Sequence, residues 1–210
     1  MLDKKIADKL DAGRQYRKIE IANIETRAED EKDMVVEGYA TVFNTPYELF
    51  SWDDYIVSEQ VDANAFDEAD MSDVIMQYDH EGRVFARVTN KTLELIVDKK
   101  GLKIRAHLGG TELGRQLYDE IRQGYITKMS FGFTVAEDKR EITEDRENHI
   151  TKVLRTITRI KKLYDVSAVS IPANDATDIS ARSYSEGVIE GIRKELSERK
   201  KKIIRILLEG

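Results

Sequence analysis

Two side chains in this sequence have the chemistry of a nucleophile and its base. Ser130 lies in the run Lys128-Met129-Ser130-Phe131-Gly132-Phe133, and His80, one of three histidines, lies in Tyr78-Asp79-His80-Glu81. A hydroxyl and an imidazole are the minimum parts of a serine nucleophile with a general base. Each also has a simpler reading, as a small polar residue tolerated in a strand and as an exposed loop histidine. Function therefore depends on whether the two side chains meet.

Other groups that could do chemistry are weaker candidates. Asp79 and Glu81 could act as paired carboxylates, but on a continuous strand they would point to the face opposite His80. His107 and His149 are predicted to be surface residues. The chain has no cysteine, and its histidines are scattered without ligand spacing, so we expect no metal or other cofactor. The sequence has neither a Gly-x-Ser-x-Gly elbow nor a glycine-rich phosphate loop, which argues against an α/β-hydrolase and against a nucleotide enzyme.

The whole chain limits the class of protein. Its 210 residues are enough for one sizeable domain with an appendage. The net charge of −6, with both signs interspersed, argues against nucleic-acid binding. No apolar run approaches the roughly 20 residues of a membrane span, and the first residues lack the apolar core of a secretory signal. We therefore expect an intracellular protein that does not bind membranes.

Three regions are expected from the pattern. Residues 1–15 form a charged leader and residues 16–182 the main domain. Residues 183–210 form an amphipathic helix with a basic middle, which is either a pro-segment trimmed by self-cleavage or an element that docks on a partner or a second copy.

Within the main domain, alternation of apolar residues predicts many strands. We expect an aromatic loop around residues 47–55, a short helix starting at Asp62, and an exposed loop over residues 137–148. The helix that begins after Thr111 and ends at Gly124 is the clearest one. A first strand is expected from Tyr16 toward an acidic turn at residues 28–33, and further strands at 34–42, 74–78, 83–90, 93–97, 102–108, 125–135, 150–160 and 163–171. This content favours a β-rich (α+β) fold, a closed or nearly closed antiparallel barrel with helices in the connections.

The order of several motifs resembles one known family. In sequence they are Glu37-Gly38-Tyr39-Ala40-Thr41-Val42-Phe43-Asn44, Asp62-Ala63-Asn64-Ala65-Phe66, Tyr78-Asp79-His80-Glu81, Met129-Ser130-Phe131-Gly132-Phe133, and Leu163-Tyr164-Asp165-Val166-Ser167-Ala168-Val169-Ser170-Ile171-Pro172-Ala173. Over roughly residues 16–182 the chain is similar to the prohead (capsid maturation) serine proteases of tailed bacteriophages and their prophages.

The resemblance implies a fold and an activity. The fold would be an antiparallel β-barrel of the herpesvirus-protease type with surrounding helices. The activity would be that of a serine endopeptidase that cuts scaffold, or a scaffolding segment of the capsid protein, and itself, inside the assembling procapsid in the bacterial cytoplasm. Carried onto this chain, His80 is the base, Ser130 the nucleophile and Asp165 the third member.

Alternatives remain open from the sequence. Asp165 could instead pair with Lys161 or Lys162. The oxyanion donors could lie near Gly124, near Gly132 or in a loop after Phe133. The chain could also be a non-catalytic β-barrel module of the same family that binds scaffold in assembly, and a small-ester hydrolase is a more distant option. In either case a homodimer or a higher oligomer is a further expectation.

Overall fold

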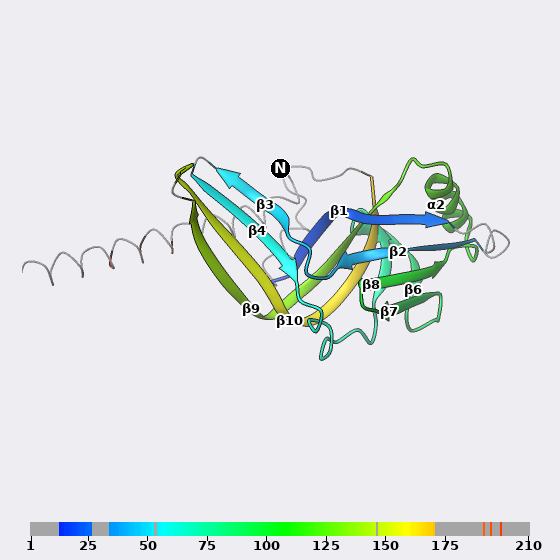
Figure 1. Cartoon of the computed structure of the whole chain (residues 1–210). Helices are drawn as coiled ribbons and strands as arrows, with labels where there is room; N and C mark the ends of the chain where they lie inside the picture. The colour runs from blue at the N-terminus through cyan, green and yellow to red at the C-terminus, as the bar shows by residue number, and fades with distance from the viewer. Residues whose placement is uncertain are drawn as a thin grey trace, which may run out of the picture.

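The computed structural model describes residues 13–26, 34–52, 54–145 and 147–170, with Gly191, Lys194 and Glu198 as isolated positions. Ten strands and one helix make up the described fold (Figure 1). The elements are β1 (Gln15–Thr26), β2 (Val35–Val42), β3 (Tyr47–Trp52), β4 (Tyr55–Val61), β5 (Ile75–Tyr78), β6 (Glu81–Arg87), β7 (Leu93–Val97), β8 (Gly101–His107), α2 (Glu112–Arg122), β9 (Lys128–Asp145) and β10 (Ile150–Val169).

All ten strands belong to one sheet with two ends. The order is β3-β4-β10-β9-β1-β2-β8-β7, and β5 and β6 branch from β10. The β-rich prediction is confirmed, but the closed antiparallel barrel is wrong, because β3 and β7 are edges that do not pair with each other. The sheet is also mixed, since β10 runs parallel to both β4 and β5.

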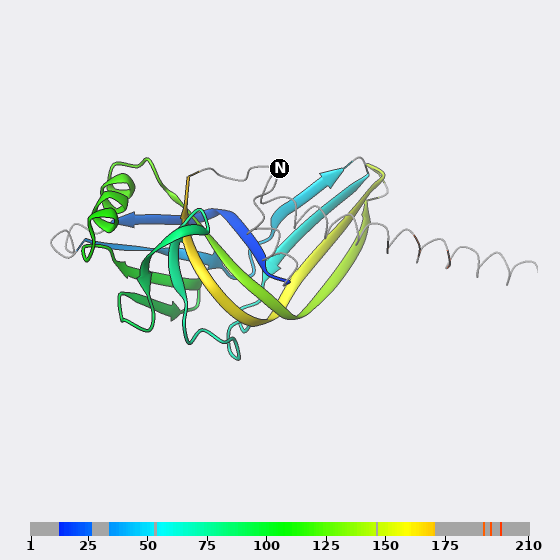
Figure 2. The same ribbon diagram turned by 180° about the vertical axis from the view of Figure 1, so that it is seen from behind.

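A long curved pair, β9 and β10, runs through the molecule and joins its two ends. Strands β3 and β4 lie along one end of this pair, whereas β2, β7, β8 and α2 gather at the other (Figures 1 and 2). The loop predicted at residues 137–148 is wrong, because β9 continues to Asp145 and pairs with β10. Seven of the nine residues from 137 to 145 are charged, so no alternation of apolar and polar residues marks this arm as a strand. The two strands predicted at 150–160 and 163–171 are one strand with irregular register.

Two further expectations between residues 47 and 68 are corrected. The aromatic loop is the hairpin β3–β4, whose strands pair antiparallel. Instead of a short helix after Asp62, the chain makes successive turns, each closed by a hydrogen bond between residues three positions apart. The N–H groups of Ala65 and Asp67 donate to the carbonyl groups of Asp62 and Asn64, respectively. Asp62 accepts from the backbone N–H of Asn64 through its side chain, a contact that favours a turn as readily as a helix cap.

The predicted helix is confirmed as α2. Thr111 caps it by accepting a hydrogen bond from the backbone N–H of Gly114, and Leu117, Tyr118 and Ile121 bury one face. This helix leads directly to β9. It therefore sets the position at which the strand that carries Ser130 begins.

The core lies on one face of β9. Met129, Phe131 and Phe133 are fully buried, and the rings of the two phenylalanines stack with centroids 4.5 Å apart. Because side chains alternate across a strand, Ser130 and Gly132 must point to the opposite face. The packing of three large side chains thus determines the direction of the serine.

Several expectations lie outside the described residues. They concern the leader up to residue 12, the acidic turn at residues 28–33, and the C-terminal amphipathic helix, of which only Gly191, Lys194 and Glu198 are described, each in helical conformation. Among the described residues, no helix has the length and apolar character needed to cross a membrane.

Candidate active site

Hydrogen bonds join Ser130, His80 and Asp165 in one continuous chain. His80 Nε2 lies 2.6 Å from Ser130 Oγ, and His80 Nδ1 lies 2.5 Å from Asp165 Oδ1. The three residues come from β9, from the turn between β5 and β6, and from β10. A carboxylate that accepts from Nδ1 leaves Nε2 facing the hydroxyl, which is the arrangement required of a general base beside a nucleophile.

The sheet itself brings the serine and the carboxylate together. Ser130 lies directly opposite Ser167, and Gly132 lies directly opposite Asp165, in the antiparallel ladder between β9 and β10. Residues two positions apart on a strand share a face, so the side chains of Ser130, Ser167 and Asp165 face the same side, and Gly132 leaves that side open. The site therefore needs only one further group, the imidazole, from elsewhere.

His80 reaches this face because the strand ends before it. Asp79 and His80 form the two-residue loop of the β5–β6 hairpin, and both have positive φ, 48° and 62°. Two consecutive left-handed residues are typical of a type I′ turn. The expectation that Asp79 and Glu81 point to the face opposite His80 assumed a continuous strand, and it does not apply because the chain turns here and directs the imidazole toward the sheet. Non-glycine residues in this conformation are uncommon and cluster at functional sites.

Asp79 holds this turn against the end of β10. Its carboxylate accepts hydrogen bonds from the backbone N–H and the hydroxyl of Ser170, at 3.1 and 2.7 Å, and its own N–H donates to the carbonyl of Ala168. Asp79 is thus a structural support for the turn that carries His80. It is not an acid–base partner of Glu81, which begins β6 and is exposed.

Asp165 is confined by small neighbours. Ser167 Oγ donates to Asp165 Oδ1 at 2.9 Å, the same oxygen that contacts His80. A methyl group at Gly132 would overlap Asp165 Oδ2, so only glycine leaves room for this carboxylate. Among the described residues, Oδ2 has no hydrogen-bond partner. The alternative pairing with Lys162 does not form, because Lys162 bonds Asp70 instead.

The site is closed to solvent. Ser130 is 0% exposed, Asp165 1% and His80 6%. The ring of Tyr16, on β1, packs on the imidazole with centroids 4.4 Å apart, and burial raises the pKa of the Tyr16 hydroxyl. Sequence reasoning did not identify Tyr16, because its contact with His80 joins residues that are far apart in the chain.

The structure also places the oxyanion loop expected after Phe133 and the other two histidines. β9 continues after Phe133, so the loop expected there as an oxyanion donor is absent. His107 lies on β8 with its Nε2 3.9 Å from a carboxylate oxygen of Glu94, and His149 is exposed at the β9–β10 turn. Within the described ranges, no three or more His, Asp or Glu side chains gather as metal ligands would.

A hydroxyl, an imidazole and a carboxylate joined in this order are the arrangement found in serine hydrolases on several unrelated folds. Comparison with models of protein families gives a match to the caudovirus prohead serine protease over residues 22–188, which contain Ser130, His80 and Asp165. The chain therefore belongs to this family. No curated protein and no solved structure matches the chain.

Proposed function

We propose that this protein is a serine endopeptidase in which Ser130 is the nucleophile, His80 the general base and Asp165 the group that orients His80. The observation that carries the proposal is the unbroken series of hydrogen bonds from Asp165 Oδ1 through both imidazole nitrogens to Ser130 Oγ. The family to which the chain belongs supports the same reaction class.

In the proposed reaction, a bond forms between Ser130 Oγ and the carbonyl carbon of the substrate while His80 Nε2 takes the hydroxyl proton. Asp165 stabilises the resulting imidazolium at Nδ1. The C–N bond then breaks as His80 passes the proton to the leaving amine, and water hydrolyses the acyl-enzyme by the same route. Asp165 stays ionised throughout, so its role is to fix the tautomer and the ring orientation.

The substrate we propose is a scaffold protein, or a scaffolding segment of the major capsid protein, of a tailed phage or prophage. Cleavage would take place inside the procapsid, in the cytoplasm of the host, and would include self-cleavage. These proposals rest on the description of the family, which names a prohead protease.

The experiment that tests the activity is mass spectrometry of the full chain after incubation, alone and with a capsid or scaffold protein encoded beside it. We expect fragments with the wild-type chain and none with Ser130→Ala, and the ends of the fragments would give the cleavage sites. Ser72→Ala serves as the matched control, because it removes an exposed hydroxyl that bonds Asp70 and lies outside the proposed triad and its supports.

A non-catalytic module of the same family is the alternative, and the complete burial of Ser130 is the observation that favours it. If the wild-type chain and Ser130→Ala both leave a confirmed capsid partner and themselves intact, even when Ser130 has been made accessible, the protease proposal fails and the binding module remains.

A further inference from the structure

The N-terminal half of β1 covers the strand that carries Ser130. Residues Gln15 to Ile19 pair antiparallel with residues 129–133 of β9, and β10 pairs with the same residues on the other side. Both edges of β9 are therefore occupied at Ser130. A protease that binds its substrate as an added strand needs one free edge beside its nucleophile, and here β1 takes that place.

The backbone of this segment also engages the nucleophile. Ser130 Oγ donates to the carbonyl oxygen of Arg17 at 2.9 Å, while it lies 2.6 Å from His80 Nε2. A hydroxyl has a single proton to donate. When that proton is directed at the Arg17 carbonyl, it is not directed at His80 Nε2, so His80 is not placed to take it. The contact thus opposes activation of the serine.

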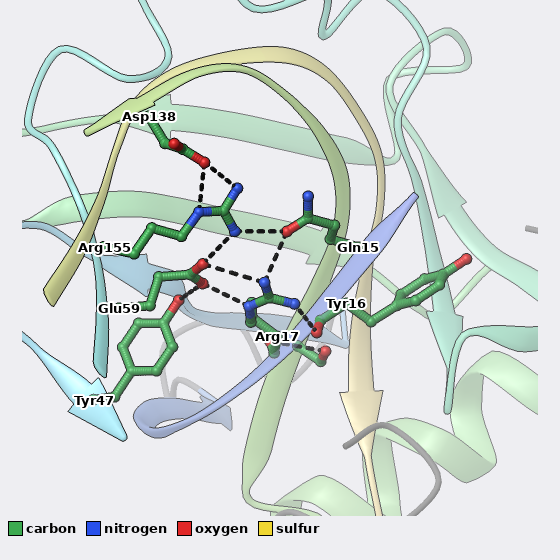
Figure 3. Close-up of polar contacts among 8 residues, drawn as sticks. Gln15, Tyr16, Arg17, Tyr47, Glu59, Asp138 and Arg155 are labelled. Carbon is green, nitrogen blue, oxygen red and sulfur yellow. Dashed lines mark hydrogen bonds and ion pairs between the residues drawn. The ribbon is translucent and has the colours of Figure 1, made fainter. Parts of the chain in front are cut away.

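The side chain of Arg17 anchors the segment in a buried pocket. Figure 3 shows Arg17 pointing from β1 toward Glu59 and Arg155, and Tyr16 pointing away from them. Glu59 accepts from Nε and Nη2 of Arg17, at 2.5 and 3.2 Å, and from Arg155 at 2.7 Å. Arg17 is 3% exposed and Glu59 0%. Burial alone would raise the pKa of Glu59, but the two guanidinium groups outweigh burial and lower it.

Further contacts line the pocket, and Gln15 Oε1 accepts from Nη2 of Arg17 at 2.7 Å and from Nη1 of Arg155 at 2.9 Å. Tyr47 donates its hydroxyl to Glu59 at 2.7 Å, and Asp138 accepts from Arg155 at 2.7 Å (Figure 3). Of the charged groups in this cluster, Glu59 and Asp138 balance Arg17 and Arg155. Removal of Arg17 would leave one negative charge in excess in a buried site, which a second cation would neutralise.

We propose that residues Gln15 to Lys18 are an intramolecular blocking strand that occupies the substrate position, and that the Glu59 pocket receives an arginine or lysine side chain of the substrate once this strand leaves. The proposal rests on the function proposed above. Residues 15–17 run antiparallel to residues 131–133 of β9, which follow Ser130. A substrate strand in this position would run in the same direction as residues 15–17.

The chain offers a point at which this segment can separate. The register of β1 on β9 shifts between Ile19 and Asn23, so the intervening residues bulge from the ladder. Beyond the bulge, Ile24 to Thr26 pair with β2 instead. The blocking segment also lies outside residues 22–188 that match the family, whereas the triad lies within them. Displacement of residues 15–19 therefore leaves the pairing of Ile24 to Thr26 with β2 in place.

The first test measures the accessibility of position 130 without relying on catalysis. The chain has no cysteine, so Ser130→Cys introduces a single thiol whose rate of alkylation by iodoacetamide reports its exposure. Adding Arg17→Ala or Tyr16→Ala should raise this rate at least about tenfold, because reactivity scales with the open fraction. Arg17→Lys should restore slow alkylation, and Arg159→Ala, which removes an arginine paired on the exposed side of β10, should not change it.

The second test measures specificity in the full chain carrying Arg17→Ala. Peptides based on Gln-Tyr-Arg-Lys are compared with the same peptides in which arginine is replaced by lysine, alanine or glutamate. We expect kcat/KM to favour the basic peptides by at least about tenfold, and Glu59→Gln to abolish this preference. Circular dichroism melting of each variant shows which of them are folded.

The outcomes separate the two proposals. Equal alkylation rates in the released and control variants would overturn the blocking strand, while Ser130-dependent self-cleavage could still support the protease. Faster alkylation without hydrolysis of any peptide would support the blocking strand and overturn the protease together with its basic subsite. Hydrolysis of all peptides at equal rates would overturn the Glu59 subsite alone.

Discussion

Gly132→Ala is the substitution whose effect follows most directly from the geometry. A methyl group at this position would overlap Asp165 Oδ2, lie 2.7 Å from Cε1 of Tyr16 and lie 3.1 Å from Asp165 Cγ. Ordinary van der Waals contact begins at 3.4 Å, so the tyrosine ring must retreat by about 0.7 Å (3.4 minus 2.7) and the carboxylate by more. Because Asp165 bonds His80 at 2.5 Å, this movement breaks the alignment of the triad.

The size of the effect can be estimated. Overpacking of a well-packed interior costs about 1–3 kcal/mol, and the lower entropy of the unfolded alanine chain offsets about 0.4–1 kcal/mol. For a chain of this length, a net loss of about 1–2 kcal/mol lowers Tm by about 2–8 °C. Misplacing the orienting carboxylate of a serine triad costs up to about 10⁴ in kcat. We therefore expect a variant that remains folded but has lost most of its activity.

Calorimetry measures the loss of stability, and proton NMR measures the loss of the hydrogen bond between His80 and Asp165, on the same samples. The short hydrogen bond between His80 Nδ1 and Asp165 should give a low-field imidazole resonance in the wild-type chain that disappears in Gly132→Ala. Gly110→Ala is the matched control, because a methyl group there meets nothing within 4 Å and the residue is exposed. If Gly132→Ala behaves as Gly110→Ala does in both measurements, the carboxylate is not confined as described and the reasoning is wrong.

Three other predictions concern stability. Since the pKa of Glu59 is lowered from its ordinary value of 4.5, its contribution is complete above that pH and is lost as the pH falls through its folded-state pKa. Urea titrations should therefore show an advantage of wild type over Glu59→Gln at pH 7 that shrinks in acid, and a constant difference would contradict this. Thr111→Ala removes the cap of α2 and should cost about 1 kcal/mol in thermal unfolding, whereas Thr111→Ser should cost far less. Phe131→Ala deletes a fully buried ring from the core and should cost about 3–5 kcal/mol in urea unfolding; a loss below 1 kcal/mol would mean that the core face of β9 is assigned wrongly.

Local signals in the sequence were sufficient for part of this molecule. Thr111, the apolar spacing after it and Gly124 define α2, because capping and helical periodicity depend on near neighbours only. Alternation around Ser130 places the serine opposite the apolar core of β9. The motif order pointed to the family and to Ser130, His80 and Asp165, but not to whether their side chains touch.

Contacts between distant residues required the tertiary structure. The direction of His80 depends on a left-handed turn that Asp79 fastens to the end of β10, and on β10 passing beside β5. The strand nature of residues 137–145 depends on pairing with β10, since exposed charged residues carry no periodic signal. Arg17 meets Glu59 across 42 positions, and nothing near either residue indicates the other. Sequence alone determined the residue types and local elements, because these follow from neighbouring side chains. Only folding decided that β1 closes the site, because strand pairing brings together segments that are more than a hundred residues apart.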